Sequence, residues 1–522
     1  MKHTRNQLMS EIQSKKNDWD VVIIGGGASG LGAAIESTTK GYKTLLLEQY
    51  DFTKGTSSRS TKLVHGGVRY LAQGNISLVF SALRERGFLR NNAPHLVSNL
   101  SFLIPSYSWW SIPFYTIGLT IYDLLAGKLS FGRSKPQSRS KTISKIPTVN
   151  KNNLRGSVLY HDGQFDDSRL GINMVQTIIE KGGTAINYMK VINLLKTDVK
   201  TCGVVVKDQE TGIIYDIKSK TVLNATGVFV NSILKKDNVN AQDIVQPSQG
   251  VHLVIDKKFW ASKYALMIPK TKDGRVLFAV PWHNKIVLGT TDVPKEEALI
   301  EPVATDDEID FILETAGRFL SKKPTRKDVK SVFAGLRPLA VSKNDDEKTK
   351  EISRGHKIYE SKSGLISIIG GKWTTYRQMG EEVINRIAKI GNLPKRKSIT
   401  ETLHLHGYKK NVDFNCALCF YGSDAEKIKD LINENPNLGD WVSEELKINK
   451  AQVVWAVRYE FARTVEDVLA RRTRALFLDA KESIRMAPTV ANIIAKELHY
   501  DNNWEKEQIS NFTKLAEGYL IK

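Results

Sequence analysis

The sequence is poor in cysteine, which excludes a disulfide-stabilised scaffold. It has 3 cysteines in 522 residues, Cys202, Cys416 and Cys419. So few cysteines cannot form a disulfide framework, and this usage is typical of a reducing compartment. Cys416 and Cys419 have C-x-x-C spacing, and His404 and His406 lie near them in the sequence. Because no second cysteine pair accompanies them, we expect no zinc site and no other metal site.

A long uninterrupted apolar run is also missing. The N-terminal stretch MKHTRNQLMSEIQSKKNDWD has no apolar core, so we expect no secretory signal and a polar tail or short helix over residues 1–18. The most apolar stretch, residues 108–127, is interrupted by Pro113 and Asp123, and its clean run is far short of the roughly 20 residues that span a bilayer. It is either a buried helix or an interfacial patch with its tryptophans at headgroup depth, and both interpretations stay open.

Signatures of nucleic-acid binding are absent as well, although the chain is strongly basic. Lys and Arg number 76 against 56 Asp and Glu, a formal net charge of +20 at pH 7. This balance favours phosphate-bearing partners, namely nucleic acid, anionic lipid or a phosphorylated small molecule. The lysines are spread along the chain without RNA-binding or zinc-finger spacing, so we expect no nucleic-acid partner. A merely solvated lysine-rich surface explains the charge equally well.

What the sequence does contain is an α/β region followed by a helical one. The length and the 41% apolar content predict two or three domains. Strand-like runs alternate with helical stretches up to about residue 400, and beyond it apolar residues recur at helical spacing. We predict a tail over 1–18, an α/β domain interleaved with a mixed-sheet domain over 19–400, and an all-α domain over 401–522. The polar, basic segment 128–152 is predicted to be a surface loop or a mobile segment.

A glycine-rich loop indicates a dinucleotide site. The sequence GGGASG, which begins at Gly25, fits G-x-G-x-x-G, follows the strand-like DVVII and opens a helical stretch. In this pattern Gly25 makes the tight turn, Gly27 lets backbone N–H groups approach a pyrophosphate, and Gly30 lets helix and strand pack closely. Ala28 and Ser29 open the helix, whose N-terminus carries partial positive charge for the phosphates.

Downstream residues narrow the choice of dinucleotide. Glu48 ends the second strand, where its carboxylate can accept hydrogen bonds from both ribose hydroxyls and would repel the 2′-phosphate of NADP. NAD and FAD are both compatible with this. FAD is favoured because the fingerprint lies almost at the N-terminus and because a second strand and turn, VLNATG with Ala225 and Gly227, returns far downstream, where it would close an FAD domain.

A second stretch combines hydroxyl groups, cations and bare backbone. Residues 55–71, GTSSRSTKLVHGGVRYL, follow Glu48 by a few residues and so emerge at the edge of the dinucleotide site. Hydroxyls can bond a pyrophosphate or a ribityl chain, and paired glycines let backbone lie against a flat ring. The residues of this stretch that we expect in the site are Thr56, Ser57, Ser58, Lys62, Leu63, His65, Gly66, Gly67, Arg69 and Tyr70.

This stretch closely resembles the signature of FAD-dependent glycerol-3-phosphate dehydrogenases. The resemblance continues in order through NNAPHL, YHDGQFDDSRLG, LNATGVFVN, VPWHNKIVLGTTD, FAGLRPL, GGKWTTYR and VRYEFARTVEDVLARRTR, and so spans nearly the whole chain. It implies a glutathione-reductase-type FAD-binding domain, a substrate cap built on a mixed β-sheet and a helical C-terminal domain. It also implies oxidation of sn-glycerol 3-phosphate at C2 to dihydroxyacetone phosphate, with hydride transfer to FAD N5 and electrons passing to a membrane quinone.

The resemblance assigns roles to particular residues. Arg69 and Arg337 match family positions at the substrate, where a phosphate dianion needs cations. Lys372 follows two glycines and is expected close to both flavin and substrate. His65 is the first candidate for the base that takes the C2 hydroxyl proton, and His252 is its rival.

Further residues complete the expected site. Tyr70, Thr290 and Asp292 are weaker candidates on the substrate side. Contacts over the flavin end are expected from Gly370, Gly371, Thr374 and Thr375. The chain departs from the family where the common NATGPW reads NATGVF, so Val228 and Phe229 replace a proline-containing pair and the stiffness of that loop is open.

Three alternatives to this function stay open. A glycerol-3-phosphate oxidase shares the first half-reaction but passes electrons to O₂ and makes H₂O₂; such oxidases tend to carry an extra cap segment that is not obvious here. A soluble NAD-dependent dehydrogenase leaves GGKWTTYR and HGGVRYL unexplained. A non-catalytic protein that binds phosphate or lipid explains the charge but not the glycine fingerprint.

The basic, aromatic-rich region 100–135 suits contact with a membrane and therefore favours quinone as the acceptor. We expect a cytoplasmic protein that associates peripherally with the anionic surface of the inner face of the cytoplasmic membrane. A homodimer is an open alternative for its assembly.

Overall fold

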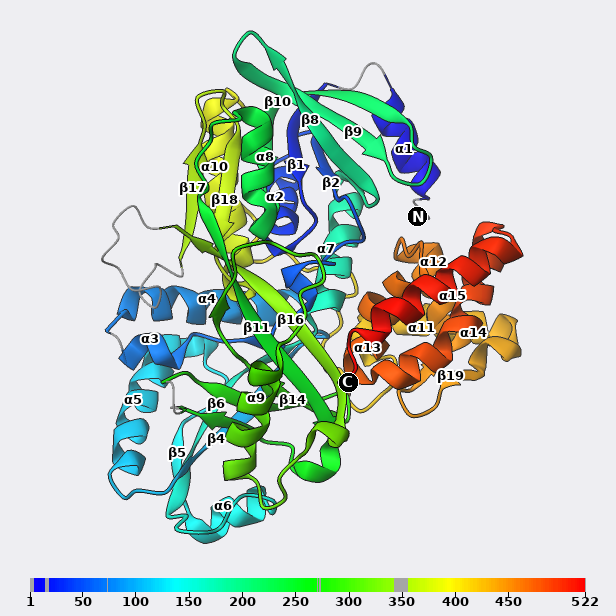
Figure 1. Cartoon of the computed structure of the whole chain (residues 1–522). Helices are drawn as coiled ribbons and strands as arrows, with labels where there is room; N and C mark the ends of the chain where they lie inside the picture. The colour runs from blue at the N-terminus through cyan, green and yellow to red at the C-terminus, as the bar shows by residue number, and fades with distance from the viewer. Residues whose placement is uncertain are drawn as a thin grey trace.

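The computed structural model describes residues 4–14, 18–72, 74–269, 271, 274–341 and 355–521. In Figure 1 two α/β bodies are stacked, and a helical region, coloured orange and red, lies beside them. The upper body contains the N-terminal strand-helix-strand unit, and the lower body contains a second sheet. Long strands connect the two bodies, so the site between them is built from both.

The upper sheet is centred on the N-terminal strand. Among the described residues it has eight strands, with the path β17-β18-β10-β1-β2-β7 and with β8 and β9 attached through β10. β1 (Trp19–Ile24) pairs in parallel with β2 (Thr44–Leu47) on one side and with β10 (Ile214–Asn224) on the other. β1 and β2 are nearly continuous apolar runs because helices or strands cover both faces, as a parallel sheet requires. The return of β10 beside β1 confirms that VLNATG closes the cofactor domain.

The remaining strands of this sheet are β7 (Thr184–Ile186), β8 (Met189–Thr197), β9 (Lys200–Asp208), β17 (His356–Glu360) and β18 (Ile366–Gly370). Its helices are α1 (Arg5–Gln13), α2 (Ala28–Thr39), α7 (Asp167–Glu180), α8 (Val230–Asp237) and α10 (Tyr376–Ile390). α2 and α10 cross closely because glycines lie at the crossing. A Cβ on Gly32 would lie 2.5 Å from the Tyr376 carbonyl oxygen, and one on Gly380 would overlap the backbone of Gly32.

The lower sheet is mixed, as predicted for the substrate cap. Its path is β15-β11-β14-β13-β12-β4-β6-β3, with β16 paired to β11 and β5 paired to β6. β4 and β12 run parallel, and the other pairs are antiparallel. β11 (Val245–Asp256) and β16 (Val329–Ala340) pair along nearly their whole length and run from the upper body into the lower one (Figure 1).

The shorter strands of the lower sheet are β3 (Leu63–Val64), β4 (Val97–Ser106), β5 (Lys135–Ser138), β6 (Gly156–Phe165), β12 (Ala265–Ile268), β13 (Leu277–Trp282), β14 (Lys285–Gly289) and β15 (Val293–Pro294). Its helices are α3 (Val68–Ala72), α4 (Ile76–Asn92), α5 (Ser111–Ala126), α6 (Arg139–Lys145) and α9 (Asp306–Phe319). The prediction of a loop or mobile segment over 128–152 was wrong for β5 and α6. β5 pairs with β6, and Ser138 caps α6 by accepting from the Lys141 N–H, so a polar segment gains regular structure at the sheet edge.

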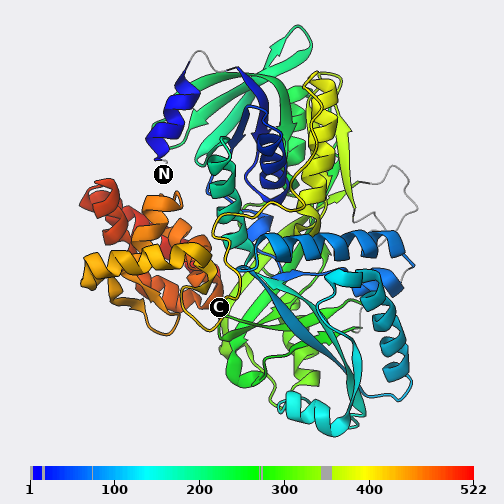
Figure 2. The same ribbon diagram turned by 180° about the vertical axis from the view of Figure 1, so that it is seen from behind.

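Helix α5 forms over the apolar stretch 108–127 and has one buried and one exposed apolar side, so the prediction of a helix is confirmed and that of an interfacial patch stays a prediction. It buries Leu119, Tyr122 and Ala126, while Trp110 and Leu124 are 85% and 74% exposed. Figure 2, seen from behind, also places α5 at the outer edge of the lower body. In the part of the chain that the structure describes, no helix combines the length and apolar character needed to cross a bilayer.

The C-terminal region is helical, as predicted, with one short β-ribbon. Its elements are α11 (Ala425–Glu434), α12 (Lys450–Tyr459), a π-helical turn (Asp467–Arg472), α13 (Ala475–Leu478), α14 (Ala480–Leu498), α15 (Asn502–Glu517) and the strands β19 (Trp441–Ser443) and β20 (Ile448–Asn449). Its apolar core is continuous with that of the cap sheet: Val468 and Phe477 share one cluster with Phe102 and Phe333. The helical region is therefore firmly docked. The boundary predicted at residue 401 falls in the extended chain between α10 and α11.

Candidate active site

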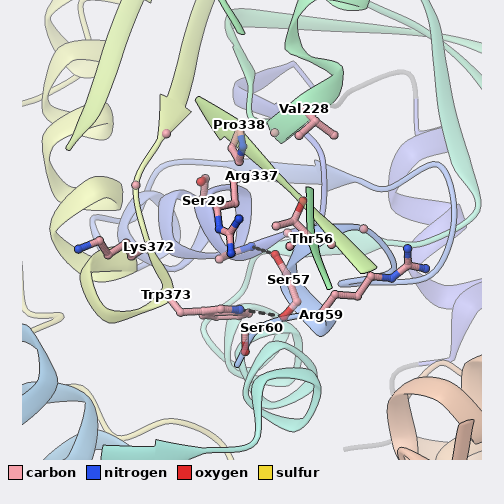
Figure 3. Close-up of a pocket in the computed structure, with 18 of the residues that line it drawn as sticks. Ser29, Thr56, Ser57, Arg59, Ser60, Val228, Arg337, Pro338, Lys372 and Trp373 are labelled. Carbon is pink, nitrogen blue, oxygen red and sulfur yellow. Dashed lines mark hydrogen bonds between the residues drawn. The ribbon is translucent and has the colours of Figure 1, made fainter. Parts of the chain in front are cut away.

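A cavity of about 480 Å³ joins the glycine loop of the upper body to the cap sheet of the lower one. On the upper side it is lined by the β1–α2 turn and by the end of β2. It is also lined by the segment after β18 and, on the side of the lower body, by β11 and β16. Figure 3 shows Thr56, Ser57, Arg337 and Lys372 around it, contributed by three separate parts of the chain.

The glycine loop has the geometry that its pattern predicts. Gly25 has φ +109°, and a Cβ there would lie 2.7 Å from the Ala225 carbonyl oxygen, so the turn abuts the end of β10. A Cβ on Gly30 would overlap the Gly25 carbonyl oxygen, which is why helix and strand need glycine there. Gly27 is the N-cap of α2 and lines the cavity with Ala28 and Ser29. The helix N-terminus is therefore open to an anion.

Glu48 lies at the end of β2, where its predicted role requires it to be. Its carboxylate accepts hydrogen bonds from the backbone N–H groups of Gly26 (2.7 Å) and Tyr50 (2.9 Å), and it lines the cavity. Burial raises the pKa of Glu48, opposed by these two hydrogen bonds. The carboxylate is thus held against the glycine loop, in position to accept from ribose hydroxyls.

The stretch 55–71 divides between the cavity wall and the protein interior. Thr56, Ser57, Leu63, His65, Gly67 and Tyr70 line the cavity. Ser57 accepts a 2.9 Å hydrogen bond from the Ala28 N–H, and its carbonyl accepts one of 2.8 Å from the Trp373 indole (Figure 3). These bonds connect the stretch to the N-terminus of α2 and to the segment after β18.

Four residues predicted to contact the cofactor are not among the described residues that line the cavity, namely Gly30 of the glycine loop and Ser58, Lys62 and Gly66 of this stretch. Lys62 turns its ammonium into the interior, 2.8 Å from Asp167 and 2.7 Å from the Ser58 carbonyl oxygen, among the rings of Trp282, Phe333 and Phe477. A buried lysine needs such a partner, and that need explains its direction. Arg69 belongs to α3, and its side chain lies outside the described part of the structure.

Arg337, Thr290 and Asp292, predicted separately, come together at the cavity. The Arg337 guanidinium lies 3.1 Å from the Asp292 carboxylate and 3.2 Å from the Thr290 hydroxyl, and it also donates to the Thr291 carbonyl. On the neighbouring strand β11, Gly250 leaves room for this side chain, because a Cβ there would overlap the guanidinium. The fork of Arg337 is thus fixed by neighbours and lines the cavity.

The segment GGKWTT carries a second cation to the same cavity. Gly370 and Gly371 have φ +74° and +84°, conformations that favour glycine, and they turn the chain after β18. The Lys372 ammonium lies 3.9 Å from the centroid of the Tyr70 ring. The Thr374 hydroxyl accepts from the His65 N–H at 3.2 Å. Gly370, Gly371, Lys372 and Thr374 line the cavity, whereas Thr375 is not among its described lining residues.

The two candidate bases, His65 and His252, both line the cavity but differ in surroundings. The His252 ring is 2% exposed and stacks on Phe333, with a centroid distance of 4.9 Å. Its Nε2 lies 2.9 Å from the Thr61 hydroxyl, and its Nδ1 is buried without a hydrogen-bond partner among the described residues. Burial, together with the charges of Arg337 and Lys62, holds the pKa of His252 well below its usual value. His252 is therefore a neutral imidazole, whereas His65 lies in a half-buried loop beside Gly66 and Gly67.

Comparison with known proteins decides the family. The model of the FAD dependent oxidoreductases matches residues 20–377, and that of the C-terminal domain of alpha-glycerophosphate oxidase matches residues 367–506. The chain is 36% identical to the mitochondrial glycerol-3-phosphate dehydrogenase of Homo sapiens over 95% of this chain and 73% of that protein. The chain belongs to the FAD-dependent glycerol-3-phosphate dehydrogenase family.

Solved structures agree with this membership. The structure of the glycerol-3-phosphate dehydrogenase from Bacillus halodurans complexed with FAD superposes with a TM-score of 0.80 at 28% identity, covering 99% of this chain and 98% of that one. The L-alpha-glycerophosphate oxidase from Mycoplasma pneumoniae gives a TM-score of 0.55 at 16% identity, over 74% of this chain and 99% of that one. This second likeness shows the shared fold alone. Both the dehydrogenase fold and the FAD-binding domain predicted from the sequence are confirmed.

The residues present fit FAD, the cofactor of the family. The glycine turn has no room for a Cβ at Gly25 or Gly30, the α2 N-terminus faces the cavity, and Glu48 is fixed beside the turn. Ser57 and Thr56 would hold the middle of the dinucleotide, while His65, Gly67, Gly371 and Thr374 would lie at the flavin end. Among the described residues no cluster of three or more metal-ligating side chains was found.

Other residues of the dehydrogenase site gave no recognisable signal in the sequence. Phe102, Tyr160, Met267 and Phe278 line the cavity from strands of the cap sheet, and Arg275 lies just before β13. Their residue types are ordinary for alternating strands, so a single sequence does not distinguish them from core residues. Asp162 also lines the cavity. It belongs to the stretch YHDGQFDDSRLG, where a charged residue within a predicted strand is a signal that could have identified it.

Proposed function

We propose that this protein oxidises sn-glycerol 3-phosphate at C2 to dihydroxyacetone phosphate and passes the electrons to a membrane quinone. The observation that carries the proposal is one cavity that joins a dinucleotide cradle to a wall bearing Arg337, Lys372 and two histidines. When bound, FAD supplies a two-electron acceptor at N5. The protein must then bind a phosphate dianion, orient C2 and accept one proton.

Arg337 is proposed to bind the phosphate. Its planar fork can donate two parallel hydrogen bonds to phosphate oxygens, and Thr290 and Asp292 hold it in place. Lys372 adds a second positive charge, which would also stabilise negative charge developing on the reduced cofactor. Arg69 and Tyr70 are proposed to complete the substrate side, since both lie in the short helix α3 that follows the glycine pair.

His65 is proposed to accept the C2 hydroxyl proton. It lines the cavity, and the hydrogen bond from its backbone to Thr374 fixes it relative to the GGKWTT segment. His252 remains the rival because its buried Nδ1 has no partner among the described residues. Its lowered pKa makes it a poorer proton acceptor, so we assign it to holding Thr61 and shaping the substrate wall.

The exposed surface around α5 supports quinone as the electron acceptor and a location at the membrane. Trp110, Phe114 and Leu124 on and beside α5 are 85%, 66% and 74% exposed, and the neighbouring segment is basic. An apolar helix face beside Lys and Arg suits peripheral contact with an anionic bilayer, where quinone is dissolved. We propose attachment to the inner face of the cytoplasmic membrane. The proposed reaction does not depend on whether the protein forms a homodimer.

The test follows the flavin absorption spectrum of the purified protein under anaerobic conditions. Adding glycerol 3-phosphate to the purified holoenzyme should bleach the visible flavin band, and a soluble quinone should restore it. Readmitted air should restore the band slowly and yield little H₂O₂. Fast reoxidation by air with stoichiometric H₂O₂ would instead identify an oxidase. A flavin band that glycerol 3-phosphate leaves unchanged would refute the substrate.

Association with the bilayer has its own test. The variants Trp110→Ser and Phe114→Ser should lose sedimentation with anionic vesicles at low salt, while keeping the rate of reduction of a soluble quinone. Ile214→Ser, which also removes an exposed apolar side chain but on β10, is the matched control and should still sediment. Wild-type protein that stays in the supernatant would refute the proposed attachment.

A further inference from the structure

The stretch ARRTR in the C-terminal helical region has no role in the scheme above. Arg471 and Arg472 end the π-helical turn, and Arg474 follows with φ +62°. Their exposed fractions are only 2%, 0% and 6%. A buried guanidinium is costly unless it is paired and hydrogen-bonded, so the partners of these side chains reveal what the segment does.

Two of the arginines converge on Asp51, which is fully buried. Arg472 donates to its two carboxylate oxygens at 2.6 and 2.8 Å, and the Arg471 Nε–H donates to the same carboxylate. Asp51 lies within residues 48–57, which we call the cofactor loop. This loop begins with Glu48 and ends with Ser57, which accept hydrogen bonds from the Gly26 and Ala28 N–H groups of the glycine loop.

The same turn makes a second tie to the cofactor loop. Lys54 lies 2.7 Å from Glu466, and Glu466 also accepts from Arg471 at 2.7 Å. Arg471 donates further to Asp467 at 2.8 Å. The cluster therefore contains three cations and three anions in mutual contact: Lys54, Arg471, Arg472, Asp51, Glu466 and Asp467. Removing any one leaves an opposite charge buried without its full set of partners.

Arg474 extends the arrangement to the other flank of the cavity. It forms an ion pair of 2.9 Å with Asp166, the N-cap of α7. The next residue, Asp167, accepts from the Ser60 hydroxyl at 2.7 Å and from Lys62 at 2.8 Å. Residues 60 and 62 lead directly into His65. One five-residue segment thus reaches both the cofactor loop and the chain that carries the proposed base.

We propose that the ARRTR segment is a positioning element of the cofactor site, in which Arg471 and Arg472 fix the cofactor loop through Asp51. Tight retention of FAD then requires the docked helical domain, although that domain contributes no residue to the described lining of the cavity. The inference concerns FAD affinity and is independent of which substrate the protein oxidises.

The test measures FAD binding in the full-length protein. FAD is removed, and the affinity of the apoprotein for FAD is measured from quenching of flavin fluorescence, without substrate. Asp51→Asn and Arg472→Lys should each raise the FAD Kd about tenfold or more, because a loop that is no longer fixed must be ordered on binding. Both should also weaken the increase in Tm that added FAD produces.

The matched control is Arg169→Lys. Arg169 forms a 2.7 Å ion pair with Glu460, is equally buried, and also joins α7 to the helical region, but its hydrogen bonds run outside the cofactor loop. It should lower the Tm of the apoprotein while leaving the FAD Kd within about twofold of the wild-type value. An equal change of Kd in Arg169→Lys, or unchanged Kd in Asp51→Asn and Arg472→Lys, would overturn the proposal.

A milder variant covers the case in which Asp51→Asn does not fold. Lys54→Met removes the tie to Glu466 but leaves both arginines on Asp51. It should raise the FAD Kd by roughly two- to fivefold with little loss of Tm, since the lysine is partly accessible and its deletion strands less buried charge. A wild-type Kd in Lys54→Met, with the other variants unfolded, would also count against the proposal.

Discussion

The backbone N–H of Gly66 donates a 2.7 Å hydrogen bond to the Tyr122 hydroxyl, which donates in turn to Asp162 at 2.7 Å. Arg86 holds the other oxygen of Asp162 at 2.6 Å, and all of these groups are buried. Burial and the neighbouring Asp162 raise the pKa of Tyr122 well above its usual value, so its hydroxyl keeps the proton that it donates. The loop that carries His65 is thereby anchored on α5, the helix whose opposite side is exposed and apolar.

Tyr122→Phe should therefore disturb the active site, although Tyr122 is not among the described residues that line the cavity. The change leaves the Gly66 N–H and an Asp162 oxygen without their buried partner, at a cost of about 1–3 kcal/mol in the free energy of unfolding. We expect kcat to fall more than KM rises, together with a shifted flavin absorption spectrum. Tyr107→Phe, which removes a 3.0 Å bond to the Asn150 carbonyl away from the cavity, is the control. Equal loss of stability in both variants with unchanged kcat would show a purely structural role for Tyr122.

Arg337→Lys tests the proposed phosphate site. A lysine keeps the charge but cannot make the paired hydrogen bonds of the guanidinium or keep its bonds to Thr290 and Asp292. We expect KM for glycerol 3-phosphate to rise about 10- to 100-fold, the value of one charged hydrogen bond, while FAD content stays unchanged. Arg326→Lys removes a comparable fork on the surface, between Asp306 and Asp310, and should leave KM alone. An unchanged KM in Arg337→Lys would exclude Arg337 from phosphate binding.

The sequence predicted the geometry of the glycine turn and the position of Glu48 well because their constraints are local. Gly25, Gly30 and Glu48 are needed by the backbone of one turn and one strand end, and a single stretch of sequence contains them all. The cap sheet was predicted in kind but not in its contribution to the site. Strands β4, β6, β12 and β13 line the cavity with Phe102, Tyr160, Met267 and Phe278, whose residue types in the sequence look like those of ordinary core residues of a strand.

Lys62 shows the opposite error: it was predicted to line the site, but its side chain lies in the protein interior. Its neighbours in the sequence line the cavity, and Lys62 was expected in the site with them. Its positive φ of +62° and the carboxylate of Asp167, 105 residues away in the chain, turn the ammonium inward instead. Long-range pairing of charges decided its direction, and such pairing is not visible in one sequence. The same holds for Asp51 and Arg472, which are 421 residues apart.

Paired substitutions should separate the two candidate bases. His65→Gln should slow flavin reduction by glycerol 3-phosphate about 10²- to 10⁴-fold, the usual contribution of a positioned base, with FAD still bound. His252→Gln should slow it much less, because the lowered pKa of His252 makes its imidazole a weak proton acceptor and the ring holds Thr61 instead. Stopped-flow reduction under anaerobic conditions measures both. The reverse order of the two effects would assign the base to His252.

The ion pairs of His406 with Glu180 and Asp424 should make the free energy of unfolding depend on pH. This side chain lies 2.6 Å from Glu180 of α7 and 2.6 Å from Asp424 at the start of α11, and so joins the cofactor domain to the helical region. Burial alone would lower its pKa, but hydrogen bonds to Asp424 and Glu180 outweigh burial and raise the pKa of His406 to about 9. The folded protein therefore holds this proton above pH 6.5, the ordinary value, whereas the unfolded chain releases it.

A raised pKa in the folded state fixes the sign of the effect. The stabilisation is fully present below pH 6.5 and is lost as the pH rises through about 9. We expect the wild-type free energy of unfolding to fall by about 2 kcal/mol across this range, after allowance for partial solvent access. Chemical denaturation at a series of pH values measures this change.

The variant His406→Gln tests the assignment to this side chain. It keeps hydrogen bonding but cannot carry the charge, so it should be less stable below pH 6.5 and should lose this part of the alkaline slope. His404→Gln is the control, because the His404 ring stacks on Tyr408 and makes no ion pair with Glu180 or Asp424 in the described structure; this variant should keep the slope. An identical slope in His406→Gln and wild type would show that the pair does not join the domains in solution.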